Sequence, residues 1–145
     1  MKILIFGLPG SGKTTLAREL AYHFLVPHYN ADTIREKADD WDFSAEGRLR
    51  QFHRINQESW GILDFVCPYE EYRYRLGADF VIWMDTIEEG RFEDTNKAFE
   101  KPNKYDMRIK RWIGLDQLHN SLGDFSPGIK GIQNYLDGPF QKLVK

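Results

Sequence analysis

A glycine-rich loop lies between an apolar run and a helix-forming run at the start of the chain. Residues 2–6 (KILIF) are mostly apolar, residues 7–15 (GLPGSGKTT) match the pattern G-x-x-x-x-G-K-S/T, and residues 16–24 (LARELAYHF) favour a helix. Glycines allow backbone N–H groups to turn inward around an anion, and the N-terminus of the following helix adds partial positive charge. The sequence therefore predicts a strand–loop–helix unit that binds the phosphates of a nucleotide.

The side chains of this loop indicate the cofactors. Lys13 can reach the terminal phosphates of a nucleotide, so we expect it to be catalytic, and the Thr14 hydroxyl can ligate Mg²⁺. We therefore expect ATP and Mg²⁺ as cofactors. The residues expected to bind the nucleotide are Gly7, Pro9, Gly10, Ser11, Gly12, Lys13, Thr14 and Thr15.

The size and composition are those of a single globular domain. The chain has 145 residues, of which 41% are hydrophobic and 29% charged, and its net charge is -2. We expect one domain over residues 1–145, a small-molecule substrate, and neither a nucleic-acid partner nor a membrane span. The single cysteine, Cys67, has no partner for an internal disulfide. A cytoplasmic protein is the simplest expectation.

Apolar runs alternate with helix-like segments along the chain. Strands are predicted at residues 2–6, 26–29, 62–67, 80–84 and 105–109, and helices at residues 16–24, 33–38 and 45–56. A closing helix is predicted from Ser126 and Pro127 onward. Ser44 is a typical N-cap for the third helix, and Pro27 favours an edge strand. This alternation predicts an α/β fold whose parallel sheet carries a ligand crevice at the carboxyl ends of its strands.

A carboxylate and an arginine follow the second predicted strand. A kinase holds its acceptor hydroxyl in line with the terminal phosphate, next to a carboxylate that binds Mg²⁺ or orients the nucleophile. Asp32 is well placed for either role, and Arg35 could bind an anionic group of the acceptor. The alternative for Asp32 is an N-cap of the helix at residues 33–38.

Two other classes of phosphate-loop protein fit less well. Residues 103–106 (NKYD) match the base-reading motif of GTPases literally, but they do not follow an apolar strand. No D-x-x-G switch motif follows a strand either, which argues against a GTPase. ATP-driven motors are usually much larger than this chain.

Several further motifs resemble the adenylylsulfate kinase family of P-loop small-molecule kinases. Residues 30–35 (NADTIR) are similar to the family's D-G-D-x-x-R, and residues 43–48 (FSAEGR) to its F-S-x-E-D-R. Arg54 and Ile55 stand where the family has R-R-I, and residues 65–69 (FVCPY) where it has F-I-S-P-Y. Residues 81–86 (VIWMDT) resemble the family's strand that ends in D-T. The match covers over half the chain.

The resemblance implies a P-loop kinase with a three-layer α/β/α fold and a parallel β-sheet. The implied reaction transfers the γ-phosphate of ATP to the 3'-hydroxyl of adenosine 5'-phosphosulfate (APS). Asp32 would be the catalytic or Mg²⁺-associated carboxylate, Arg35, Arg48 and Arg54 would bind or orient the phosphosulfate, and Phe43 would stack on its adenine. The alternatives are a core position for Phe43 and a solvated helix face for the arginines. A homodimer is compatible with the resemblance.

The sequence departs from the family pattern at defined positions. Asn30, His53, Cys67 and Glu70 replace an aspartate, an arginine, a serine and an arginine of the motifs, and the segment between residues 55 and 61 is shorter. A carboxylate at position 70 would repel a phosphosulfate if it lay at the substrate mouth. These departures keep two alternatives open: a kinase of the same fold with another small-molecule or polynucleotide hydroxyl acceptor, and a nucleotide-binding module without efficient catalysis.

Two remaining features lie outside these motifs. Residues 87–104 are charged and non-periodic, so we expect a mobile segment near the site, in which Arg91 and Lys97 are candidates to neutralise the transferring phosphoryl group. Cys67 lies in apolar surroundings and is interpreted as a buried structural thiol. The four histidines show no metal-ligand spacing.

Overall fold

The computed structural model describes residues 1–111 of the chain. The elements are, in order, β1 (Lys2–Phe6), α1 (Lys13–Phe24), β2 (His28–Asn30), α2 (Ala31–Ala38), α3 (Ala45–Asn56), β3 (Gly61–Asp64), α4 (Glu70–Leu76), β4 (Phe80–Met84), α5 (Glu93–Ala98) and β5 (Met107–Ile109). The closing helix predicted from Ser126 lies outside the described residues. The single domain predicted over residues 1–145 also extends beyond them.

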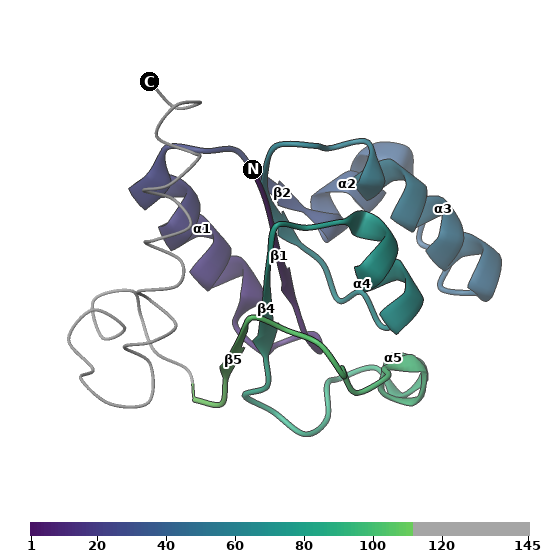
Figure 1. Cartoon of the computed structure of the whole chain (residues 1–145). Helices are drawn as coiled ribbons and strands as arrows, with labels where there is room; N and C mark the ends of the chain where they lie inside the picture. The colour runs from purple at the N-terminus through teal and green to yellow at the C-terminus, as the bar shows by residue number, and fades with distance from the viewer. Residues whose placement is uncertain (112–145) are drawn as a thin grey trace. The chain divides into compact units, whose positions relative to one another are not determined.

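The five strands form one parallel sheet in the order β2-β3-β1-β4-β5 (Figure 1). The central strand β1 pairs with both β3 and β4, with Ile5 opposite Asp64 on one side and Ile82 on the other. The predicted edge position of the second strand is confirmed. Because all strands run the same way, the loop after β1 lies at the middle of the carboxyl edge of the sheet, where parallel α/β sheets bind ligands.

Side chains of the central strands alternate between two covered faces. Leu4, Phe6 and Leu63 pack in one core cluster with Phe52 of α3 and with side chains of α4. The intervening residues of β1 point to the opposite face, which α1 covers with the buried Leu16, Ala17 and Leu20. Figure 1 shows α1 on one side of the sheet and α3 and α4 on the other. The described chain is therefore built in three layers.

Strand β3 is shorter than predicted. The sequence predicts a strand over residues 62–67, whereas β3 covers Gly61–Asp64. Cys67 has a φ of +45°, in the left-handed region, so an extended strand does not continue through it. Its thiol is fully buried in the core cluster, which confirms the structural interpretation, and burial raises its pKa far above the usual value.

Helices α4 and α5 have no counterpart in the sequence prediction. Each has seven residues or fewer, which gives little room for a periodic apolar pattern. Helix α4 is fixed by the buried Arg73, whose Nε donates to the Cys67 carbonyl at 2.8 Å and whose Nη2 donates to the carbonyls of Pro68 at 3.0 Å and Glu100 at 2.6 Å. Arg73 therefore ties the segment after α5 to the loop after β3.

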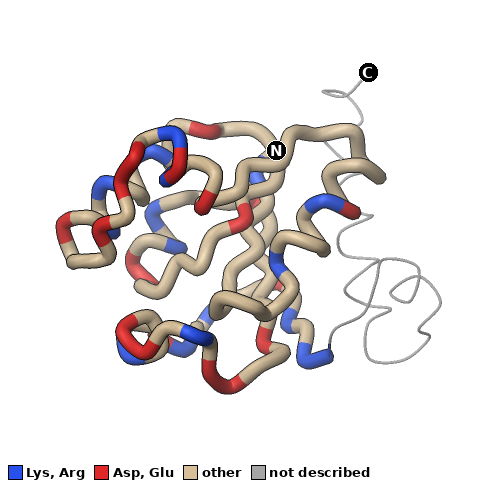
Figure 2. The backbone as a smooth tube through the Cα atoms, turned by 180° about the vertical axis from the view of Figure 1, so that it is seen from behind, with Lys and Arg blue, Asp and Glu red and all other residues tan. Residues whose placement is uncertain are grey.

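Charged residues of both signs are interspersed along the described backbone (Figure 2). Within residues 1–111, no helix has the length and apolar character needed to cross a membrane.

Candidate functional site

The loop after β1 has the backbone of an anion cradle. Gly10 and Gly12 have φ values of +86° and +98°, in the left-handed region that glycine adopts without strain. A Cβ at Gly7 would lie 2.6 Å from the Met84 carbonyl oxygen, so only glycine lets the loop start this close to β4. The Ser11 amide donates to the Leu8 carbonyl at 3.1 Å and closes the turn. The loop predicted from the sequence is therefore a compact turn ahead of α1.

Lys13, at the first position of α1, is buried inside this loop. Its Nζ donates to the Leu8 carbonyl at 3.0 Å. Burial lowers the pKa of Lys13, while the charges of Asp64 and Asp32 act in the opposite direction. The lysine is thus held in the cradle next to two carboxylates.

Asp64, at the end of β3, is the site residue that sequence reasoning missed. It is buried, and its Oδ2 accepts a hydrogen bond from Asn30 Nδ2 at 2.8 Å and lies 3.2 Å from His28 Nε2. Burial raises the pKa of Asp64, but hydrogen bonds from His28, Thr14 and Asn30 and the charge of Lys13 outweigh it, so the net pKa lies below the usual value. A buried ionised carboxylate therefore faces the loop.

Asn30 connects this carboxylate to the loop and to α2. Its Nδ2 also lies 3.2 Å from Thr14 Oγ1, while its Oδ1 accepts from the Thr33 amide at 3.0 Å. Asn30, and not Asp32, is therefore the N-cap of α2. The alternative interpretation of Asp32 as the cap is wrong, and the exposed Asp32 carboxylate lies in the first turn of the helix.

A cavity of about 310 Å³ opens in front of the loop. Its wall includes most of the predicted site residues: Pro9, Gly10, Lys13, Thr14, Asp32, Arg35, Phe43 and Arg48. It also includes residues that were not predicted as site residues: Asn30, Ala31, Phe65, Val66 and Pro68, which lie within the quoted motifs, and Asp64, Tyr72, Phe92, Asp94 and Thr95, which no motif indicated. Arg91 also lines the cavity, which confirms for this residue the expectation that the segment 87–104 lies near the site. Lys97 is not among the lining residues.

An aromatic and cationic cluster, contributed by α2, α3 and the loop between them, forms another part of the cavity wall. The Arg35 guanidinium carbon lies 4.4 Å from the centre of the Phe43 ring, and that of Arg48 lies 5.5 Å from it. Arg48 is buried, and its Nε donates to the Phe43 carbonyl at 2.9 Å and its Nη2 to Thr95 Oγ1 at 3.3 Å. Phe43 is 43% exposed, so it is not a core residue. Arg48 is not a solvated residue of the helix face either.

The predicted site residues that do not line the cavity are Gly7, Ser11, Gly12, Thr15 and Arg54. Arg54 is not among the lining residues; its Nη1 donates to Gln51 Oε1 at 3.0 Å and its Nη2 to Asp40. Glu70 is not a lining residue either, and its carboxylate accepts from the amide and side chain of Asn103 at 2.6 and 2.9 Å. The expected repulsion between Glu70 and an anionic substrate therefore has no basis in this geometry.

A second cavity, of about 910 Å³, begins at Leu8 of the loop and follows the carboxyl ends of β4 and β5. Trp83, Tyr105 and Arg108 contribute to its wall, and the Arg108 guanidinium carbon lies 4.5 Å from the centre of the Trp83 ring system. Thr86, in the same wall, donates from its hydroxyl to the Ser11 carbonyl at 2.7 Å. The phosphate loop therefore has one cavity at Lys13 and another at Leu8.

The residues present fit a nucleotide phosphate with Mg²⁺. Beyond Gly10 the space is open, since the nearest atom to a Cβ there would be Ile87 Cδ1 at 3.9 Å. Ser11 Oγ is buried with no hydrogen-bond partner among the described residues. Within residues 1–111 no three His, Cys, Asp or Glu side chains form a metal-binding group. The Thr14 hydroxyl and the Asp64 carboxylate line the same cavity, and Mg²⁺ is usually held by one or two carboxylates together with substrate phosphates.

Gly47 allows the loop before α3 to lie against the first turn of that helix. A Cβ at this position would lie 2.0 Å from the Asp42 carbonyl oxygen, a backbone atom that cannot rotate away. We expect Gly47→Ala to destabilise the protein by about 1–3 kcal/mol through overpacking, although alanine in an open helix stabilises by roughly 0.5–1 kcal/mol. Urea unfolding measures the difference.

Gly77→Ala is the matched control for that substitution. A Cβ at Gly77 meets nothing within 4 Å, but its φ is +60°, so only backbone strain is expected there. A gain of stability in Gly47→Ala would contradict the close packing of the loop on α3.

Comparison with known proteins gives matches among solved structures. No protein-family model and no curated protein matches the sequence. The APS kinase of Mycobacterium tuberculosis, solved with AMPPNP and APS, is 16% identical with a TM-score of 0.61, over 94% of this chain and 97% of that one. A shikimate kinase from Aquifex aeolicus is 17% identical with a TM-score of 0.58, over 95% and 97%. A gluconokinase from Sinorhizobium meliloti is 13% identical with a TM-score of 0.62, over 94% and 97%.

These identities are low, so the likeness shows the fold. The parallel five-stranded sheet with its helices has the α/β architecture of P-loop small-molecule kinases, as the sequence predicted. The three enzymes are named for three different substrates, and the likeness singles out none of them.

Proposed function

We propose that the protein is an ATP-dependent kinase that transfers the γ-phosphate to a hydroxyl group of a small molecule. The observation that carries the proposal is a single cavity with two kinds of wall. The phosphate loop with Lys13 and Thr14 forms one wall, and Arg35 and Phe43 belong to the other. The fold shared with three small-molecule kinases supports the same class of reaction.

On the nucleotide side, the backbone N–H groups of residues 7–15 and the Lys13 ammonium would bind the phosphates. Thr14 and Asp64 would hold Mg²⁺, and Asp32 could add a further carboxylate oxygen. Mg²⁺ would supply charge neutralisation at the phosphate oxygens. The cavity beside Leu8, with the aromatic Trp83 and Tyr105, offers space for the nucleoside part.

On the acceptor side, Asp32 would hold the acceptor hydroxyl and receive its proton as the new phosphate ester forms. Arg35 uses Nη1 for two backbone carbonyls, and its Nε and Nη2 make no hydrogen bond with other described residues. Those two nitrogens can bind an anionic group of the acceptor. Arg91 lines the same cavity and would neutralise charge on the transferring group.

APS is the acceptor that we propose first. Its phosphosulfate would meet Arg35 and Arg48, and its adenine would stack on the exposed face of Phe43. This assignment rests on the motif resemblance and on the joint presence of those three residues in one cavity. Another hydroxylated anion of similar size is the alternative, because Arg35, Arg48 and Phe43 suit more than one anionic ligand.

The deciding experiment is ADP release from Mg-ATP in the presence of APS, shikimate or gluconate, with Lys13→Ala as the blank. Stimulation by APS that is lost in the variant would establish the first proposal. Stimulation by another acceptor would keep the kinase and change its substrate. ATP binding without stimulation by any of the three would favour a nucleotide-binding module and would remove the support for catalysis.

Asp32→Asn separates binding from turnover. We expect kcat to fall by about 10²–10⁴-fold, because the amide no longer accepts the hydroxyl proton, with ATP affinity nearly unchanged. Glu36→Gln, an equal change of charge on the exposed side of α2, is the control and should keep full activity. Unchanged turnover in Asp32→Asn would remove Asp32 from the mechanism.

A further inference from the structure

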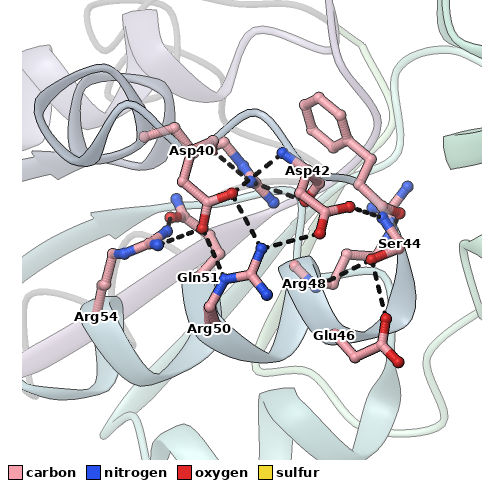
Figure 3. A network of polar contacts seen from close by, with 11 residues as sticks. Asp40, Asp42, Ser44, Glu46, Arg48, Arg50, Gln51 and Arg54 are labelled. Carbon is pink, nitrogen blue, oxygen red and sulfur yellow. Dashed lines mark hydrogen bonds and ion pairs between the residues drawn. The ribbon is translucent and has the colours of Figure 1, made fainter.

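Two aspartates of the loop between α2 and α3 bind two arginines of α3 (Figure 3). Arg50 donates to both carboxylate oxygens of Asp40, from Nε at 2.9 Å and Nη2 at 3.2 Å, and from Nη2 to Asp42 at 2.9 Å. Arg54 donates from Nη2 to Asp40 as well. We refer to Asp40, Asp42, Arg50 and Arg54 as the carboxylate clamp.

The same carboxylates shape the backbone of their own loop. Asp40 Oδ1 accepts from the Asp42 amide at 3.2 Å, and Asp42 Oδ1 accepts from the Ser44 amide at 2.9 Å. Ser44 in turn caps α3 by accepting from the Gly47 amide at 3.2 Å. The clamp therefore fixes the path of residues 39–44 as well as their distance from α3.

The other side of this loop faces the cavity. Arg35 Nη1 donates to the carbonyls of Asp40 at 2.9 Å and Asp42 at 3.1 Å, and Arg48 holds the Phe43 carbonyl. The carboxylates of the loop therefore bind the arginines of α3, Arg50 and Arg54. Its backbone carbonyls bind the arginines that line the cavity. Any displacement of the loop would thus move Phe43 and Arg35 together.

Arg54 connects the clamp to the start of α2. Its Nη1 donates to Gln51 Oε1, and the buried Gln51 donates from Nε2 to the Ala31 carbonyl at 2.8 Å. Ala31 precedes Asp32 and also lines the cavity. The guanidinium of Arg54 is thus committed to Asp40 and Gln51, and it has no place in the cavity wall.

We propose that Arg50 and Arg54 are positioning residues, which hold the loop of residues 39–43 so that Phe43 and Arg35 present a preformed surface to the acceptor. The positioning role rests on the proposed kinase function, whereas the restraint on the loop does not. A substrate-binding role for Arg54 would require it to leave Asp40, which would then keep only Arg50 as its arginine partner.

The clamp keeps its charge over the working pH range. Hydrogen bonds from Arg50 and Arg54 hold the pKa of Asp40 far below its usual value, and those from Ser44 and Arg50 lower the pKa of Asp42 to about 2. Because these pKa values are lowered, both carboxylates are ionised above the ordinary aspartate pKa. The ion pairs of the clamp are lost only as the pH falls towards 2. Substitution is therefore the way to open it at neutral pH.

Hydrogen exchange of the unliganded full-length protein tests the restraint on the loop. We expect the amides of Asp42, Ser44 and Gly47 to exchange about tenfold faster in Arg54→Ala and in Asp40→Asn, because local opening becomes easier. Amides of β1 should keep their wild-type rates. Arg54→Lys, which retains the charge, should restore part of the protection. Unchanged exchange at these three amides would overturn the proposal.

Kinetics with APS as the probe test the positioning role. A positioning role predicts that Arg54→Ala and Asp40→Asn each raise the KM for APS by about tenfold, with the KM for ATP unchanged, and that the double variant is no worse than either. If Arg54 bound the acceptor itself, Asp40→Asn would free it and lower that KM, which would overturn the positioning role. Faster exchange without any change of KM would overturn it as well.

Two controls separate this result from a general loss of stability. Arg18→Ala on the exposed side of α1 and Asp39→Asn beside the clamp make the same charge changes and should leave both readouts at wild-type values.

If the wild-type protein turns over APS, shikimate and gluconate at no measurable rate, the proposed function fails. The exchange experiment then still decides whether the clamp holds the loop, so the two failures are distinguishable.

Discussion

Replacement of Lys13 by alanine is expected to abolish acceptor-dependent ADP formation, with a loss of at least about 10²–10³-fold in kcat, the range found when one preorganised donor is removed from a reacting anion. Lys13 is buried in the loop, where the charges of Asp64 and Asp32 act on it, so its ammonium is the cation that the variant removes from the cradle. Stopped-time assays of ADP release at saturating Mg-ATP measure the loss.

Lys37→Ala, on the exposed side of α2, is the control for the Lys13 variant. It removes the same charge from a position outside the cavity lining and should retain wild-type turnover. Substantial turnover in Lys13→Ala, with the protein folded, would contradict the placement of phosphate chemistry at this loop and with it the proposed function.

Asp64→Asn is expected to impair both turnover and the response to Mg²⁺. The substitution keeps the shape of the side chain but removes the charge that faces Lys13 and that would hold Mg²⁺ with Thr14. We expect kcat to fall by about 10²-fold or more, and the Mg²⁺ concentration for half-maximal activity to rise at least about tenfold, the usual range for loss of metal-site groups. A Mg²⁺ titration at fixed ATP measures both quantities.

The stability of the Asp64 variant needs a separate measurement, since the carboxylate accepts from His28 and Asn30. Its pKa is lowered in the folded protein, so the carboxylate stabilises the fold above the ordinary aspartate pKa and that contribution disappears as the pH falls below it. Asp79→Asn, at the amino edge of the sheet, also removes one negative charge and is the control for that change in net charge. An unchanged Mg²⁺ response in folded Asp64→Asn would exclude Asp64 from the metal site.

The phosphate loop could be predicted from sequence because its chemistry is local. The glycines, Lys13 and Thr14 are consecutive in the chain, and the flanking strand and helix follow from runs of one residue type. Ser44 is another local signal, and its capping of α3 is confirmed. Fold class follows from the alternation of such runs, and the structure has the predicted parallel sheet.

Asp64 could not be found in the same way. A lone aspartate at the end of an apolar strand has no motif of its own, and its role emerges from two register pairs, with Ile5 of β1 and Asn30 of β2. Those pairs depend on the strand order, which could not be predicted from the sequence. The signal that could have indicated Asp64 is that this acidic residue interrupts an otherwise apolar run just before Phe65.

The arginines of α3 show the opposite problem. Motif order placed Arg54 at the substrate, yet position along a helix does not tell which carboxylate approaches it from a neighbouring loop. Asp40 lies fourteen positions earlier in the chain and competes for the guanidinium. The position of Glu70 relative to the substrate could not be predicted for the same reason, because its partner Asn103 is distant in sequence.

The double attachment of Asn30 bears on any attempt to redesign the acceptor range of this protein. One amide group caps α2 with its oxygen and reaches Asp64 and Thr14 with its nitrogen, so position 30 links the two halves of the cavity. A library that varied this position would alter nucleotide and acceptor recognition at once. Val66 lines the same cavity with an aliphatic side chain outside that polar framework, which makes it the better first position to randomise.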